Sequence, residues 1–209
     1  MRRWLPLLLL TVAGAAVFAV SLNGSGHGSR ARAPGVAALH HAAVHHPRRH
    51  RIVAGPHRDP VPILMYHVVS EPQPGAPYPD LYTPAPVFAA QMHALARRGY
   101  HGVTLRQADD YWTKGYALPR RPIVVSFDDG YLSDYSHARP VLRALRWPGV
   151  LNLEIDNVRP GDLTAHQVKA LIAAGWEIDS HTVTHPDLRT LTDAQLRHEL
   201  TASRAYIQR

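Results

Sequence analysis

The sequence has 209 residues, 45% of them hydrophobic, and no cysteine, so it has room for one packed domain and excludes disulfides, thiolate metal sites and a cysteine nucleophile. Its formal charge of +7 lies entirely in residues 1–60, which hold eight Arg and one acid, whereas residues 61–209 hold fifteen basic and fifteen acidic residues. The neutral globular part lacks the basic footprint of a nucleic-acid binder, so we expect no nucleic-acid partner.

Residues 1–22 have the pattern of a signal peptide or a membrane anchor. Arg2 and Arg3 precede an uncharged, largely apolar run of nineteen residues that ends at Leu22. This length is close to the roughly 20 residues that a helix needs to cross a bilayer, and no clear small-x-small cleavage site closes the run. Both interpretations predict an exported protein, extracellular or at the cell surface, that contacts the membrane if the segment stays uncleaved.

Residues 23–59 are expected to form a disordered linker. They hold seven His and six Arg among Gly, Ala, Ser and Pro, with few large apolar side chains. Such a segment buries too little surface to offset the entropy lost on ordering. The His pairs also suit metal binding, but we favour a solvated basic tether.

From residue 60 onward, short apolar runs alternate with helical patterns. In chain order the predicted elements are strand Val61–Val69, helix Pro86–Arg98, strand Gly102–Leu105, helix Gln107–Lys114, strand Pro122–Phe127, helix Asp134–Arg146 kinked by Pro140, strand Gly149–Ile155, helix Leu163–Ala174, strand Trp176–Ser180 and helix Thr192–Gln208. Strands that alternate with helices predict parallel βαβ units. A closed barrel normally needs more than five strands. We therefore expect an α/β domain over residues 60–209 that is truncated at its C-terminus.

Two adjacent carboxylates follow the most strongly β-branched strand. Asp128 and Asp129 stand at its carboxyl end, where parallel α/β folds place their chemistry, and Gly130 comes next. Adjacent like charges are costly there unless a cation neutralises them. A solvated Asp-Asp-Gly turn is the simpler alternative for these residues on their own.

Two histidines follow the last predicted strand. His181 and His185 stand four residues apart, a spacing suited to metal ligation. The intervening Thr-Val-Thr is β-branched and His185 precedes a proline, so this segment is predicted to be a loop. Two imidazoles and one carboxylate would leave a coordination position open for water, and the second carboxylate could take the proton of that water. The combination suits metal-assisted hydrolysis of an amide or ester.

Three segments resemble one known family. SFDDG, residues 126–130, resembles the TFDDG motif of the polysaccharide deacetylases, which contain the NodB homology domain and form carbohydrate esterase family 4. WEIDSHTVTHPDL, residues 176–188, resembles the H-[ST]-x-x-H motif of that family. VPILMYH, residues 61–67, resembles the first strand of the subgroup related to poly-N-acetylglucosamine and peptidoglycan deacetylases. The resemblance covers about residues 60–209.

This resemblance implies a fold, an activity and a set of site residues. The fold would be a NodB-type distorted (β/α) barrel, and the activity removal of N-acetyl groups from a cell-surface or cell-wall polysaccharide. Asp128 would be the catalytic base, while Asp129, His181 and His185 would bind a divalent metal ion, with zinc as the expected ion. His67 is a candidate for the substrate pocket, and buried packing is an equally good interpretation of it. The substrate would be an N-acetylated glycan of the peptidoglycan or poly-N-acetylglucosamine type.

The sequence also departs from the family pattern. No later Pro-Tyr motif and no Leu-x-His motif, which supplies the general acid in the family, follows His185. Residues 149–155 differ from the usual Ala-Thr-Phe-Phe-Val type of strand. We therefore expect weak turnover from this chain. The alternative is a catalytically impaired remnant that serves as a surface protein binding metal or glycan.

Overall fold

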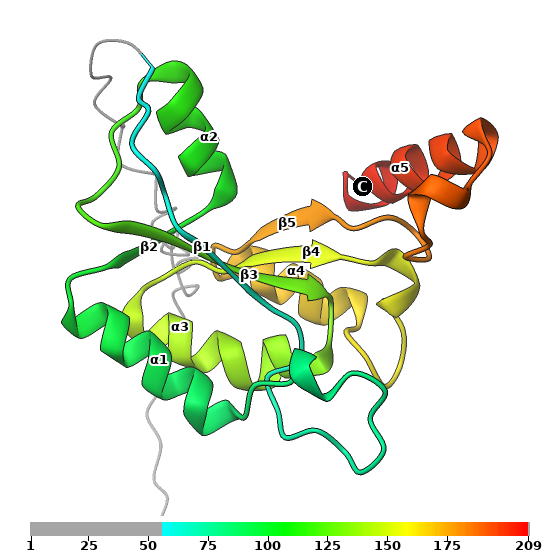
Figure 1. Ribbon diagram of the computed structural model, residues 1–209, viewed down its shortest axis with the longest axis horizontal. Helices are drawn as coiled ribbons and strands as arrows, with labels where there is room; N and C mark the ends of the chain where they lie inside the picture. Colours follow the sequence, from blue (N-terminus) through cyan, green and yellow to red (C-terminus); the bar gives the residue numbers. More distant parts are fainter. Residues whose placement is uncertain (1–55, 209) are drawn as a thin grey trace, which may run out of the picture. The chain divides into compact units, whose positions relative to one another are not determined.

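The computed structural model describes residues 56–208 (Figure 1). The predicted signal or anchor, residues 1–22, and nearly all of the predicted linker, residues 23–59, lie outside the described residues. Within the described part, no helix combines the length and the apolar character needed to cross a membrane.

Residues 56–208 contain a five-stranded sheet in which every pairing is parallel. Its strands are β1 (Ile63–Tyr66), β2 (His101–Val103), β3 (Pro122–Asp129), β4 (Val150–Leu153) and β5 (Glu177–Ser180). The main order is β1-β3-β4-β5, and β2 pairs with the first residues of β3. All five lie within or beside the predicted runs, and the α/β class with a parallel sheet is confirmed. In this part of the chain the sheet is open, with β1 and β5 at its two ends.

The central strand β3 fixes which side chains face the helices. Residues alternate between the two faces of a strand. Val125 and Phe127 enter the main hydrophobic core, and both are fully buried. Ser126 and Asp128 therefore lie on the opposite face, where they are also largely buried. Core packing thus holds one face of β3, and the Asp128 side chain, near the carboxyl end of the strand, lies on the other face.

Three helices cover one face of the sheet: α1 (Ala85–Arg97), α3 (Arg139–Leu145) and α4 (Ala165–Ala173) (Figure 1). On the other face, α2 (Leu105–Lys114) packs on a second small core at the beginning of the strands. The last helix, α5 (Asp193–Ile207), contacts β5, the strand at one end of the sheet. The face that carries Asp128 therefore has helix cover at the start of the strands, away from their carboxyl ends.

An aromatic cluster ties the central strand to its neighbours. Phe127 stacks on Trp176 with ring centroids 5.1 Å apart, and Phe88 of α1 lies 5.8 Å from Phe127. Tyr66 of β1 meets Phe88 edge-on at 5.0 Å. Aromatic pairs at these distances contribute beyond their buried area. The residue directly before Asp128 is thus held by contacts that reach from β1 to the start of β5.

Three helices begin with the same capping arrangement. The N-cap threonine accepts a hydrogen bond from the backbone of a glutamine three residues later, whose side chain bonds back to the cap. The pairs are Thr104 with Gln107, Thr164 with Gln167, and Thr192 with Gln195. These capping boxes satisfy two backbone donors at each helix start. They explain why α2, α4 and α5 begin within two residues of their predicted positions.

The predicted helix over Asp134–Arg146 is present but irregular: residues 132–145 are helical without a break, and Asp134–Ala138 form a π-helical turn within them. A π-helical turn at Asp134–Ala138 leads into α3, and Pro140 lies in the first turn of that helix. Proline removes one backbone hydrogen bond from a helix, and Pro140 follows the π-helical turn, where the regular hydrogen-bond ladder is already interrupted. Short 3₁₀ turns that the sequence did not indicate also occur, at Pro79–Leu81, Ile155–Asn157 and Leu188–Thr190.

Candidate metal centre

The carboxyl ends of β3, β4 and β5 bring the two predicted motifs together. In the strand register Asp129 lies beside Leu153, which lies beside Ser180, the residue before His181. The Asp-Asp pair and the first His are therefore separated by one intervening strand, although more than fifty residues lie between them in sequence. Parallel strands place their carboxyl ends at one edge, so this meeting follows from topology.

A sharp turn after β3 sets the direction of Asp129. Its φ of +73° lies in the left-handed region, and Gly130 follows with φ +92°. A Cβ at Gly130 would lie 2.6 Å from Cδ1 of Leu153, so only glycine fits without a shift. The side-chain N–H of Asn157 donates to the backbone oxygen of Asp129 at 3.1 Å. Together these contacts hold Asp129 in a conformation that a regular strand would not provide.

Three donor atoms converge at this point. Oδ1 of Asp129 lies 3.6 Å from Nε2 of His181 and 3.7 Å from Nε2 of His185, and the two nitrogens are 3.0 Å apart. One ligand atom from each residue lies within 4.8 Å of the others. The side chains are 13%, 31% and 54% exposed for Asp129, His181 and His185, so the group opens to solvent on the imidazole side.

The segment between the two histidines is a loop, as predicted. Thr182 and His185 both have left-handed φ values, +72° and +50°. The N–H of His185 donates to Oγ1 of Thr182 at 3.0 Å. On one side the backbone N–H groups of Ile155 and Asp156 donate to the carbonyl oxygens of Thr182 and Val183. A β-branched residue at positive φ is uncommon and needs such support.

Asp128, the residue before Asp129, has its own partners. Its side chain is largely buried, and Oδ1 accepts a hydrogen bond from the amide of Asn152 at 2.7 Å. Nε2 of His67 lies 3.9 Å from Oδ2. The structure therefore places His67 next to Asp128, among the site residues. Asp128 thus has one carboxylate oxygen bonded to Asn152 and the other on the side of His67.

The local electrostatics suit a cation. Burial, followed by the negative charge of Asp129 and a hydrogen bond to it, raises the pKa of Tyr131 to about 12. Burial and then the charge of Asp129 also raise the pKa of Glu154. Oδ1 of Asp129 is buried and has no hydrogen-bond partner among residues 56–208. A buried carboxylate oxygen facing two imidazole nitrogens is a donor set that fits Zn²⁺ or a similar divalent ion.

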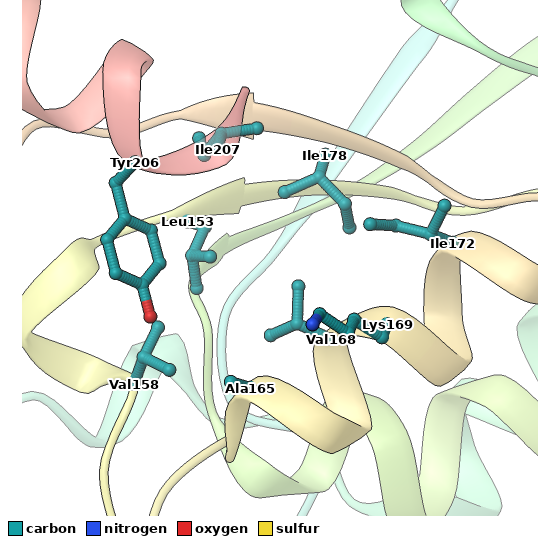
Figure 2. Close-up of a pocket in the computed structure, with 9 residues that line it drawn as sticks. All are labelled: Leu153, Val158, Ala165, Val168, Lys169, Ile172, Ile178, Tyr206 and Ile207. Carbon is teal, nitrogen blue, oxygen red and sulfur yellow. The ribbon is translucent and has the colours of Figure 1, made fainter. Parts of the chain in front are cut away.

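An apolar hollow in the described region is a separate feature. It has a volume of about 300 Å³ and lies between β4, β5, α4 and α5 (Figure 2). Leu153, Val168 and Ile178 line it, together with Tyr206 near the end of α5. None of the five predicted site residues lines this hollow, so the chemistry predicted from the sequence lies outside it.

Sequence reasoning missed several side chains that support the centre. Asn152, Asn157 and Glu199 hydrogen-bond to the Asp-Asp pair or to the His181–His185 loop. Asn152 could have been noticed, because an amide is unusual in an apolar strand such as GVLNL, residues 149–153. This strand was also one of the departures from the family pattern. For Glu199 no local pattern distinguished it from the exposed acids of a surface helix.

Fold and donors together define a parallel α/β protein with an Asp-His-His group at the carboxyl ends of its strands. Residues 115–209 match the family model described as Polysaccharide deacetylase. YxkH of Bacillus subtilis (strain 168), which is named for this family, is 30% identical over 145 residues, covering 69% of this chain and 50% of that protein. These matches confirm the resemblance to the polysaccharide deacetylases noted in the sequence.

Two further relatives widen the comparison. The crystal structure of BC0361, a polysaccharide deacetylase from Bacillus cereus, has 30% sequence identity and a TM-score of 0.61, covering 71% of this chain and 46% of that one. The poly-beta-1,6-N-acetyl-D-glucosamine N-deacetylase of Escherichia coli (strain K12) is 39% identical over 56 residues, which are 27% of this chain and 8% of that protein. The chain thus spans about half the length of YxkH and less than half of BC0361.

Proposed function

We propose that residues 60–209 carry the base and the metal ligands of a hydrolase that removes N-acetyl groups from a polysaccharide. One observation carries this proposal: Asp129, His181 and His185 converge within 4.8 Å, and Asn152 holds the side chain of Asp128, the residue before Asp129. The match of residues 115–209 to the polysaccharide deacetylase family model supports the reaction type.

In this proposal Asp129, His181 and His185 would hold a divalent ion, and zinc is the ion we expect. When bound, such an ion supplies a Lewis acid that polarises an acyl oxygen and acidifies a water molecule. The chain's own residues then provide position and proton transfer. The donor atoms come from the end of β3 and from the loop after β5, both held by hydrogen bonds within the chain, and this reduces the reorganisation needed for binding.

Asp128 would act as the general base. Its Oδ1 is engaged by the Asn152 amide, so Oδ2, on the His67 side, remains available to accept a proton from water. A positioned general base contributes roughly 10²–10⁴-fold to a rate. His67 would line the pocket beside this carboxylate and help to orient the attacking water or the acyl group.

The substrate in this proposal is an N-acetylated glycan of the peptidoglycan or poly-N-acetylglucosamine type. The name of the Escherichia coli relative, a poly-beta-1,6-N-acetyl-D-glucosamine N-deacetylase, supports this class. We also propose that residues 1–22 export the protein to the cell surface, where such polymers lie. A reporter fused to residues 1–30 should leave the cytoplasm, and a reporter that stays soluble there would reject export.

Acetate release from N-acetylglucosamine oligomers tests the activity. The full chain should release acetate weakly and only with divalent metal, and Asp128→Asn should abolish release while metal binding persists. Asp109→Asn, a substitution of an exposed acid on α2, is the matched control and should leave the rate unchanged. Metal binding without any acetate release would reject the enzyme and favour the metal- or glycan-binding remnant.

A further inference from the structure

Glu199 of α5 is a largely buried acid whose carboxylate contacts the loop that carries both imidazoles. Its Oε2 accepts the backbone N–H of Val183 at 2.7 Å and that of Thr184 at 3.0 Å. Its Oε1 accepts the hydroxyl of Thr184 at 2.9 Å. Both oxygens are therefore used by the residues midway between His181 and His185.

The loop has a conformation that needs this support. Thr182 and His185 occupy the left-handed region without being glycine, a conformation that persists only where the surroundings impose it. Backbone N–H groups of Ile155 and Asp156 hold two carbonyls of the loop. Glu199 accepts hydrogen bonds from the N–H groups of Val183 and Thr184. The loop is thus fixed both through its carbonyls and through its N–H groups. The bonds to its carbonyls come from the 3₁₀ turn at Ile155–Asn157, and those to its N–H groups come from α5.

The attachment of α5 to the sheet does not depend on Glu199 alone. Ser203, one turn further along α5, is fully buried, and its hydroxyl lies 2.7 Å from that of Ser180 at the end of β5. Burial by itself would raise the pKa of Glu199, but the N–H and hydroxyl donors of Val183 and Thr184 outweigh it, and the pKa is lowered. Glu199 is therefore a carboxylate at neutral pH, as an acceptor for three donors should be.

We propose that Glu199 is a positioning residue of the metal centre. It contacts neither ligand side chain, yet it fixes the segment that sets the 3.0 Å separation of the two imidazole nitrogens. This inference rests on the proposed metal site. Groups that orient ligands from outside typically contribute 10–100-fold to metal affinity, so loss of Glu199 should weaken binding by that order.

Zinc titration of the full chain provides the first test. Glu199→Ala should weaken binding by roughly 10–100-fold. Glu199→Gln, which keeps one oxygen able to accept the N–H groups, should recover part of the loss. Thr192→Ala is the matched control, because it removes the capping box of α5 and leaves Glu199 in place. It should bind zinc as the wild type does. Equal weakening by Thr192→Ala and Glu199→Ala would overturn the proposal, because the effect would then come from helix stability.

Two further measurements separate positioning from folding. In the metal-free protein, amide hydrogen exchange at Val183 and Thr184 should be faster in Glu199→Ala, while exchange in β3 stays unchanged. With Co²⁺ as the probe, the visible absorption of the bound ion should change in Glu199→Ala and move back towards wild type in Glu199→Gln. Unchanged exchange at both amides would overturn the proposal. If Glu199→Ala does not fold, the same two measurements on Glu199→Gln decide, since an unchanged spectrum and unchanged exchange there would reject it.

Failure of the proposed metal site and failure of the positioning role of Glu199 would give different results. A wild-type chain that binds zinc no better than a His181→Ala/His185→Ala variant would reject the proposed metal centre. The amide exchange measurement would still show whether Glu199 holds the loop. Zinc binding in the wild type that is unaffected by Glu199→Ala would reject only the positioning role.

Discussion

The two halves of the candidate centre are built in different ways. Asp128 and Asp129 end the central strand β3, whose apolar residues are buried between helices and neighbouring strands. His181 and His185 follow β5, a strand at the end of the described sheet, and their loop is held by hydrogen bonds from α5 and from the 3₁₀ turn at Ile155–Asn157.

This difference shows where each half obtains its rigidity. Residues of β3 are fixed by packing, which is also what stabilises the whole domain. The His181–His185 loop is fixed by a few polar contacts, and the His185 side chain is 54% exposed. Changes in the carboxylate half should therefore affect folding, whereas changes in the imidazole half should affect metal affinity with little cost in stability.

Removal of both imidazoles should have the largest effect. His181→Ala/His185→Ala should lower zinc affinity by more than about 100-fold, because ligands contribute more than the groups that merely orient them. Isothermal titration of the full chain measures this, with urea unfolding as the check on stability. His166→Ala, a change at an exposed histidine of α4, should leave affinity unaltered. Stoichiometric binding that persists at the domain in the double variant would contradict the ligand assignment.

In the carboxylate half, Gly130→Ala should reduce the free energy of unfolding by about 2–4 kcal/mol, through backbone strain and overpacking. Its Cβ would lie 2.6 Å from Leu153, at a φ of +92°. Gly161→Ala is the control, since Gly161 has φ +101° but nothing within 4 Å of the added carbon. Urea unfolding of both variants separates the strain from the contact. If both lose equal stability, the contact with Leu153 plays no part.

Asn152→Ala should affect both stability and turnover. It removes the 2.7 Å hydrogen bond to Oδ1 of Asp128, and bonds to charged groups contribute about 1.5–3 kcal/mol. We expect kcat/KM for acetate release to fall roughly 10-fold, with zinc affinity close to wild type. Ser126→Ala changes a neighbour on the same face, whose hydroxyl donates to the backbone of Leu64, and should have a smaller effect. A loss of zinc affinity in Asn152→Ala equal to the loss of rate would place Asn152 with the metal ligands.

The smallest effect is expected at Asp134, a fully buried acid five residues after Asp129. Burial, with the charges of Asp129 and Asp128 adding to it, raises the pKa of Asp134 well above its usual range. A group whose pKa is higher in the folded state binds protons on folding, so its contribution to stability is present below about pH 4 and is lost as pH rises towards the folded pKa. Asp134→Asn should therefore be more stable than wild type at pH 7.

Urea unfolding between pH 4 and pH 8 tests this pH dependence. The stability difference between Asp134→Asn and wild type should grow with pH, and Asp109→Asn should follow the wild type throughout. Two parallel curves for Asp134→Asn and wild type would show that Asp134 titrates normally in the folded chain.

Much of this molecule could be predicted from local sequence. The five strands, the parallel α/β class and the loop character of residues 181–185 follow from apolar runs, β-branching and the proline after His185, which act over a few residues. The convergence of Asp128, Asp129, His181 and His185 could also be expected, because parallel strands bring their carboxyl ends to one edge.

Only the tertiary structure decided which side chains support these residues. The π-helical turn at Asp134–Ala138, the amide of Asn152 on Asp128 and the carboxylate of Glu199 on the histidine loop involve partners that periodicity does not connect. Glu199 and Thr184 are fifteen residues apart. Whether an acid in an amphipathic helix is solvated or buried depends on the surface against which the helix packs, and that surface is set by the assembled sheet.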